Sequence, residues 1–134
     1  MKYIIAFVFL LATFQTQAQK DTWQLSTHIL DIGKGLPAPG VTVELEKMNE
    51  KNNTWTLVDK KVTDENGRIK YFLKNGKNND GIYKLIFRVA KYFEMNHTES
   101  FYPFIEVVFQ IKGENHFHVP ITLSPFGYST YRGS

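Results

Sequence analysis

Residues 116–134, HFHVPITLSPFGYSTYRGS, close the chain and contain its clearest strand pattern. In an extended strand, alternate side chains share one face. One face of this stretch is wholly apolar, with Phe117, Val119, Ile121 and Leu123. We expect that face to pack against the core of a sheet protein, while the alternate residues, two histidines among them, point outward.

The rest of the chain reads as short strands separated by turn residues. Alternating or branched apolar segments predict strands at residues 23–30, 41–46, 55–62, 69–73, 82–89 and 105–111. Residues 90–96 contain no helix breaker and are predicted to form two turns of helix. Seven or eight strands, with turns about every 8–12 residues, predict an all-β protein built as a β-sandwich.

Two hairpins are predicted from the turns. Asn66 and Gly67 both tolerate positive φ, so they are expected to join the strand at residues 55–62 to the strand at residues 69–73. Residues 112–115 are expected to join the strand at residues 105–111 to the C-terminal strand.

The first 18 residues have the layout of a secretory signal peptide. Lys2 precedes an apolar run at residues 3–14, and a short polar segment ends at Ala18. The run is shorter than the roughly 20 residues that span a bilayer. We expect cleavage after Ala18, which leaves residues 19–134 as one domain in the periplasm or outside the cell. An uncleaved membrane anchor is the alternative.

Charge and composition narrow the possible functions. Removal of residues 1–18, which hold one lysine and no acid, lowers the net charge from +3 to +2. This balance, without a basic patch interleaved with aromatics, argues against nucleic acid as a partner. The chain has no cysteine, so an exported domain of this size depends on its core and on oligomerisation for stability.

Two features of the C-terminal stretch indicate a site. His116 and His118 would stand roughly 6–7 Å apart on the outer face of a strand, a spacing that suits a metal or a shared substrate. The alternative is a pair of solvated surface histidines. The tail beyond them is rich in aromatic residues, Phe126, Tyr128 and Tyr131, so we expect it to pack against another surface.

Four ordered blocks resemble the 5-hydroxyisourate hydrolases, transthyretin-like proteins of purine breakdown. The blocks are LSTHILD at residues 25–31, GLPAPGVTVEL at 35–45, TDENGRI at 63–69 and HVPITLSPFGYSTYRGS at 118–134. The final tetrapeptide YRGS is diagnostic of the hydrolases, and transthyretins proper lack it. The resemblance runs from about residue 23 to the C-terminus, and it implies a two-sheet transthyretin-like sandwich of eight strands with one short helix.

The resemblance also implies the site residues. The catalytic residues would be His28, Arg68 and His118, and the substrate-binding residues would be His116, Tyr131, Arg132, Gly133 and Ser134. Histidine accepts a proton near neutral pH, and a guanidinium offers five fixed donors to a developing oxyanion. Which histidine is the base stays open, because the two would be coupled. His97 falls outside every block and is predicted to lie on the surface.

The implied reaction is hydrolysis of 5-hydroxyisourate to 2-oxo-4-hydroxy-4-carboxy-5-ureidoimidazoline by a homotetramer, a dimer of dimers, with no covalent intermediate. His28, His116 and His118 would also make a zinc set with an open fourth position. We favour turnover without any cofactor, with zinc at these histidines as an inhibitor. The alternative functions are a transthyretin-like carrier of a small aromatic ligand and a secreted interaction domain. No membrane partner is expected after cleavage of the leader.

Overall fold

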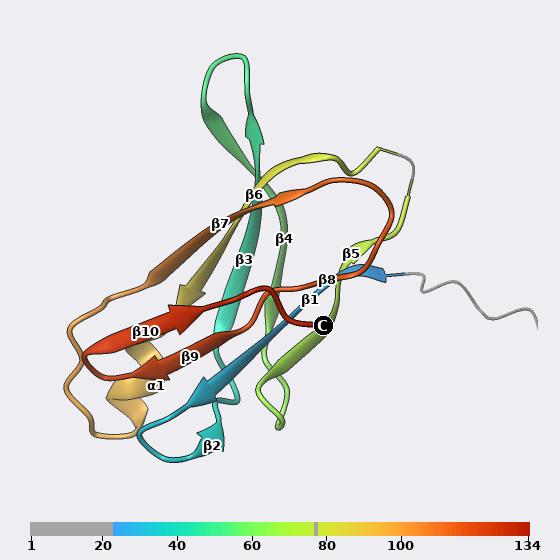
Figure 1. Cartoon of the computed structure of the whole chain (residues 1–134). Coiled ribbons are helices and arrows are strands. Elements are labelled where there is room, and N and C mark those ends of the chain that lie inside the picture. The colour runs from blue at the N-terminus through green and yellow to red at the C-terminus, as the bar shows by residue number, and fades with distance from the viewer. Residues whose placement is uncertain (1–22, 77) are drawn as a thin grey trace, which may run out of the picture.

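The computed structural model describes residues 23–76 and 78–134. The predicted leader, residues 1–18, lies outside them. The described chain forms strands β1 to β10 and one short helix, arranged as two sheets (Figure 1). This confirms the predicted two-sheet all-β fold with a short helix. Within the described residues, no helix is long and apolar enough to cross a membrane.

The first sheet is centred on β1 (Trp23–Asp31). Its antiparallel partners are β2 (Leu36–Pro37) and β5 (Arg68–Lys74). Its parallel partners are β8 (Phe117–His118) and β9 (Ile121–Ser124), and β10 (Gly127–Thr130) lies antiparallel beside β9. The C-terminal stretch therefore lies next to the N-terminal strand of the domain (Figure 1).

The second sheet is antiparallel throughout, in the order β4-β3-β6-β7. Its strands are β3 (Thr42–Asn49), β4 (Thr54–Val62), β6 (Gly81–Arg88) and β7 (Ile105–Ile111). The helix α1 (Ala90–Met95) follows β6 and confirms the predicted helical segment.

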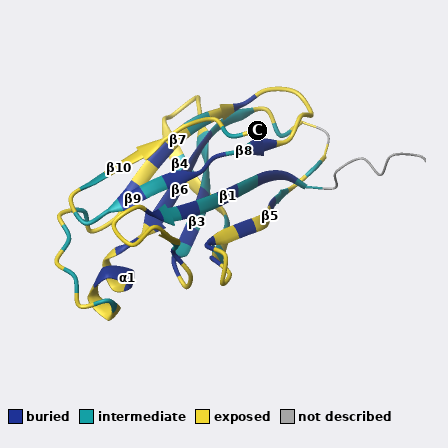
Figure 2. Ribbon diagram, turned by 60° about the horizontal axis from the view of Figure 1, so that its bottom comes forward, coloured by how far each residue is buried: buried dark blue, intermediate teal, exposed yellow. Residues whose placement is uncertain are grey.

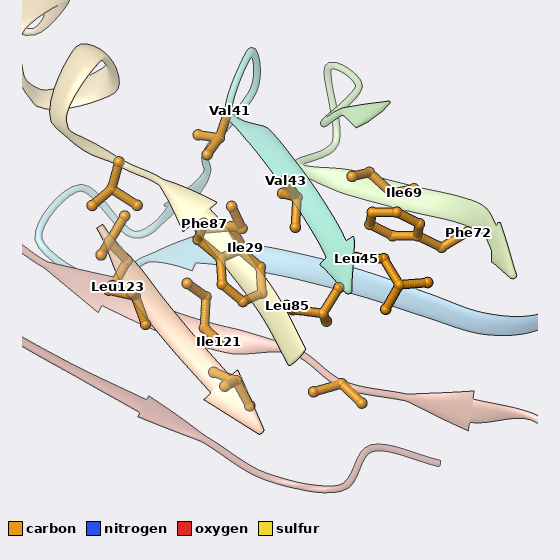
Figure 3. Packing of buried hydrophobic residues seen from close by; sticks show 14 of the residues in the cluster. Ile29, Val41, Val43, Leu45, Ile69, Phe72, Leu85, Phe87, Ile121 and Leu123 are labelled. Carbon is orange, nitrogen blue, oxygen red and sulfur yellow. The ribbon is translucent and has the colours of Figure 1, made fainter. Parts of the chain in front are cut away.

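The core fills the space between the two sheets (Figure 3). The predicted apolar face of the C-terminal stretch is confirmed, since Phe117, Val119, Ile121 and Leu123 are all 9% exposed or less. Side chains from both sheets meet them, among them Ile29, Val43, Leu45, Leu85 and Phe87. Burying each large apolar side chain contributes roughly 1.5–3 kcal/mol, so this packing fixes the position of β1 between β5 and β8.

The predicted hairpin at Asn66 and Gly67 is wrong. The strand before this turn, β4, pairs with β3, and the strand after it, β5, pairs with β1 in the other sheet. The turn therefore joins the two sheets. Gly67 has φ 68°, and a Cβ on it would lie 2.6 Å from the Ile29 carbonyl oxygen. Glycine is needed here because the turn packs closely against β1.

The second predicted hairpin is also wrong. β7 pairs with β6, whereas β8 and β9 pair with β1, so residues 112–116 cross from one sheet to the other. The predicted C-terminal strand is divided between β8 and β9 by Val119 and Pro120. Proline has no N–H to donate to a ladder, which accounts for the break. Most of β10 and the tail after it is exposed in this single chain (Figure 2).

Candidate active site

The central strand β1 presents two polar side chains on the outer face of its sheet. Thr27 and Ile29 are fully buried, while Ser26 and His28, which alternate with them along the strand, are partly exposed on the opposite face. The alternation of β1 thus places His28 away from the core. Both neighbours of β1 add functional side chains to this outer face.

Arg68 lies beside His28 because β5 pairs with β1 in the register His28↔Arg68. Residues directly opposite in an antiparallel pair have Cβ atoms about 4.5–5.5 Å apart. The preceding turn fixes where β5 begins, since Asp64 Oδ1 accepts hydrogen bonds from the backbone N–H groups of Asn66 and Arg68, both 2.9 Å long. These bonds, that of Arg68 first, lower the pKa of the Asp64 carboxyl group.

His118 comes to the same face from the other side of β1. The parallel register pairs Ser26 with His118, and Ser26 Oγ lies 2.8 Å from His118 Nδ1. The tail then returns, and the Gly133 N–H donates to the His118 carbonyl at 2.9 Å. A Cβ on Gly133 would overlap the His118 ring, at 3.1 Å from Cγ and nearer still to Cδ2. The backbone of Gly133 therefore packs directly against the imidazole.

The electrostatic environment favours the neutral form of both histidines. Burial, followed by the positive charge of Arg68, lowers the pKa of His28 below its ordinary value of 6.5, against the opposing effects of the Asn66 backbone and Asp64. Burial, followed by the charges of Arg68, His28 and His116, also lowers the pKa of His118. At neutral pH both rings can accept a proton.

Two adjoining hollows open on this face. One of about 340 Å³ is lined by Ser26, Thr27, Arg68, Lys70 and His116. The other, of about 370 Å³, is lined by His28, Leu30, Pro37, Asn66, Arg68 and Lys70. Arg68 and Lys70 line both, so two positive charges stand where a substrate would lie. Lys70 was missed in the sequence, although its place two residues after Arg68 on a strand was the available signal.

The tail residues divide between two places. Gly133 contacts His118, but Tyr131 and Arg132 line a separate hollow of about 300 Å³ over β7, and the Arg132 guanidinium lies 5.2 Å from the Phe117 ring centroid. Ser134 is exposed. The expected packing of the aromatic tail occurs only in part in the single chain: the centroid of the Tyr128 ring lies 5.2 Å from that of the Tyr102 ring, whereas Phe126 is 68% and Tyr131 58% exposed.

His116 lies beside His118, and both of its ring nitrogens have hydrogen-bond partners within the chain. Its Nε2 is 2.8 Å from Ser26 Oγ, and its Nδ1 is 3.0 Å from the Trp23 carbonyl oxygen. In the described part of the chain, no group of three His, Cys, Asp or Glu residues is placed to hold a metal ion. The zinc set expected from His28, His116 and His118 is therefore not formed. His97 is exposed, as predicted.

A larger hollow lies elsewhere, beside α1. It measures about 540 Å³, and its ionisable lining residues are Lys34, Glu65 and Tyr92. Burial, followed by a hydrogen bond to Asp31, raises the pKa of Tyr92, so its hydroxyl keeps its proton. No histidine lines this hollow, unlike the face with His28 and His118.

Comparison with known proteins decides the family. The family model described as HIUase/Transthyretin family matches residues 25–133. The chain belongs to this family. A 5-hydroxyisourate hydrolase of Salmonella dublin is 48% identical over 111 residues, which cover 82% of this chain and 80% of that protein.

Solved structures of the family superimpose on this chain. The structure of Klebsiella pneumoniae 5-hydroxyisourate hydrolase has a TM-score of 0.71 at 36% identity and covers 84% of this chain and 94% of its own. Sea bream transthyretin in complex with thyroxine has a TM-score of 0.76 at 30% identity, covering 81% and 93%. The same fold thus occurs in an enzyme and in a ligand-binding protein, so the function of this chain has to be inferred from its site residues.

Proposed function

We propose that this member of the HIUase/Transthyretin family hydrolyses 5-hydroxyisourate to 2-oxo-4-hydroxy-4-carboxy-5-ureidoimidazoline in urate breakdown. The observation that carries the proposal is the convergence of His28, Arg68 and His118 on one face of one sheet. Relatives named as hydrolases of this substrate support it. A carrier of an aromatic ligand is not favoured, because this face presents two histidine bases, His28 and His118, and two cations, Arg68 and Lys70.

In the proposed mechanism, His28 and His118 orient a water molecule and one of them removes its proton. The hydroxide attacks the ring carbonyl carbon of 5-hydroxyisourate. Arg68 donates to the carbonyl oxygen and stabilises the oxyanion as it develops, because its guanidinium is charged at any working pH. No side-chain hydrogen bond or ion pair engages this guanidinium elsewhere within residues 23–76 and 78–134.

The tetrahedral intermediate then collapses. The carbonyl re-forms, the C–N bond of the ring breaks, and the leaving nitrogen takes the proton held by the histidine. The proton taken from water is thus returned, and the base is neutral again for the next turnover. General acid–base catalysis of this kind contributes about 10²–10⁴-fold, and one oxyanion donor contributes about 10²–10³-fold.

Product identity tests the proposal. The protein should convert freshly generated 5-hydroxyisourate, followed by ¹³C NMR, to the ring-opened carboxylate faster than buffer alone. Conversion at the buffer rate by a folded protein would refute the hydrolase function. Tight binding of an aromatic ligand such as thyroxine without any conversion would instead support a carrier.

We also propose that the protein works as a homotetramer, a dimer of dimers. Large apolar side chains that the single chain leaves exposed support assembly, among them Val108 on β7, Phe126 and Tyr131. Such residues are usually covered when they gather at an interface. Native mass spectrometry should give four chains, and a stable monomer with full activity would contradict the proposal.

The leader-like sequence at residues 1–18 supports export to the periplasm or the medium. Cell fractionation with N-terminal sequencing should find the mature chain outside the cytoplasm, starting at Gln19. An uncleaved chain in the cytoplasmic or membrane fraction would contradict this.

A further inference from the structure

A continuous row of hydrogen-bonding groups lies behind His118. Ser26 Oγ is 2.8 Å from His118 Nδ1 and 2.8 Å from His116 Nε2. His116 Nδ1 in turn lies 3.0 Å from the Trp23 carbonyl oxygen. The row therefore runs from the backbone of β1 through two side chains to one nitrogen of the catalytic ring.

The Trp23 carbonyl group at the end of the row determines which atom is the donor in each of these hydrogen bonds. A carbonyl oxygen only accepts, so His116 Nδ1 must carry a hydrogen. A neutral imidazole has only one N–H, so His116 Nε2 accepts the hydrogen of the Ser26 hydroxyl. That hydroxyl has no second hydrogen, and its oxygen must accept from His118 Nδ1–H. His118 then holds its hydrogen on Nδ1, and its Nε2 carries a free lone pair.

We propose that Trp23, His116 and Ser26 form a relay that fixes the tautomer of His118 so that Nε2 is the proton acceptor in the reaction. Ser26 and His116 are then positioning residues that need not touch the substrate. This proposal rests on the proposed hydrolysis for its catalytic meaning, but the tautomer itself is a property of the free protein. It also replaces the substrate-binding role expected for His116.

The opposite direction is disfavoured by charge. If the Ser26 hydroxyl donated to His118 Nδ1, its oxygen would have to accept from His116 Nε2–H. His116 would then carry hydrogens on both nitrogens and be a cation, next to the positive charge of Arg68 that lines the same hollow. Two positive charges that line one hollow repel each other, which disfavours this arrangement.

The packing around His118 supports the same assignment. The Gly133 backbone covers the ring at Cδ2, and Ser26 Oγ meets Nδ1 on the other side of the ring. A ring held at both points cannot flip, so Nε2 stays on the outer face. After Nε2 takes the proton of water, Nδ1–H still donates to Ser26, and the imidazolium keeps its orientation. A buried carboxylate does this for the histidine of a serine protease.

The test combines a spectroscopic and a kinetic readout on the same protein. Long-range ¹H–¹⁵N correlation spectra of ¹⁵N-histidine-labelled full chain, recorded near pH 8, report which ring nitrogen is protonated, and a His118→Asn sample assigns the signals. We expect a protonated Nδ1 and an unprotonated Nε2 on His118. Ser26→Ala and His116→Phe should both convert His118 largely to the Nε2–H form.

The same two variants should lower kcat by about 10–100-fold with little change in KM. This is less than the full 10²–10⁴-fold of a lost general base, because a fraction of molecules keeps the active tautomer. His116 is exposed, so His116→Phe should fold normally. Ser26→Thr, which retains the hydroxyl, should have the wild-type tautomer of His118 and the wild-type kcat. Ser124→Ala is the matched control, since this serine donates to the Gly127 carbonyl, outside the relay.

Two results would overturn the relay. One is an Nε2–H tautomer of His118 in the wild-type protein. The other is an unchanged tautomer and kcat in both Ser26→Ala and His116→Phe. A wild-type protein with the expected tautomer but no hydrolysis would refute the proposed function and leave the relay standing.

Discussion

Gly133→Ala is the change that separates catalysis from folding most cleanly. The added Cβ would lie 3.1 Å from His118 Cγ, 3.2 Å from its Cβ and below 3.0 Å from Cδ2. Carbon atoms in contact are ordinarily about 3.5–4.0 Å apart, so relieving the contact with Cδ2 requires the ring or the tail to move by roughly 1 Å or more. A misplacement of about 1 Å can cost on the order of 10² in rate, and we expect a loss of that size in kcat/KM.

The assay is the ultraviolet decay of freshly generated 5-hydroxyisourate, with circular dichroism and assembly mass measured on the same sample. The fold should be unchanged, because Gly133 lies after β10, the last strand of the described chain, and outside the core. Gly76→Ala is the control, since a Cβ there meets nothing within 4 Å. Wild-type turnover in a folded, assembled Gly133→Ala protein would refute the argument that the tail holds the His118 ring.

Four other outcomes are expected in the same assay. Both Arg68→Lys, which loses the planar fork, and Arg68→Ala should lower turnover about 10²–10³-fold. The reaction needs neutral histidines, so kcat/KM should decrease as the pH is lowered, with the decrease occurring below pH 6.5. Arg68 lowers the pKa of both His28 and His118, so in Arg68→Ala the same decrease should occur at a higher pH. A lysine that restores turnover, or an unmoved acid limb in Arg68→Ala, would contradict these roles. Deletion of residues 131–134 should abolish most turnover without loss of the fold, since the hydrogen bond from Gly133 to His118 is lost. A C-terminal tag should have a similar effect because it crowds this contact, whereas a tag at the mature N-terminus should be tolerated. Full activity of the truncated chain would mean that the tail has only a packing role. Chelation should leave turnover unchanged, because protein atoms bind both ring nitrogens of His116; a loss that added zinc reverses would contradict this.

Side-chain alternation predicted which residues face the core but not which strands pair. Phe117, Val119, Ile121 and Leu123 lie on the buried face, as their spacing indicated. The spacing is the same whether the next strand is a hairpin partner or belongs to the opposite sheet. For that reason both predicted hairpins were wrong, although the strands themselves are present.

The turn at Asn66 and Gly67 shows why local signals can mislead about pairing. The glycine is required by the Ile29 carbonyl oxygen, an atom far away in sequence that comes close only in the folded chain. Gly67 also has a positive φ of 68° in this crossing turn, as a glycine can have in a hairpin, so the same dipeptide suits both kinds of connection. Sequence alone does not separate them.

The sequence predicted candidate catalytic residues for the site but not the residue that connects two of its histidines. Block resemblance pointed to His28, Arg68 and His118, and the strand registers bring them to one face. Ser26 was missed because a serine on the outer face of a strand carries no distinguishing signal. Its importance depends on the parallel pairing of β8 with β1, which places its hydroxyl between two histidines 90 and 92 residues away.

The most direct test of the central claim compares the protein with one triple variant, His28→Asn, Arg68→Lys and His118→Asn. The quantity measured is the decay rate of freshly generated 5-hydroxyisourate at equal concentrations of folded, assembled protein. If His28, Arg68 and His118 carry out the hydrolysis, decay should be rapid with the wild-type chain and no faster than the spontaneous rate with the variant. Equal acceleration by both would place the chemistry away from these residues, and the spontaneous rate with both would contradict the proposed function.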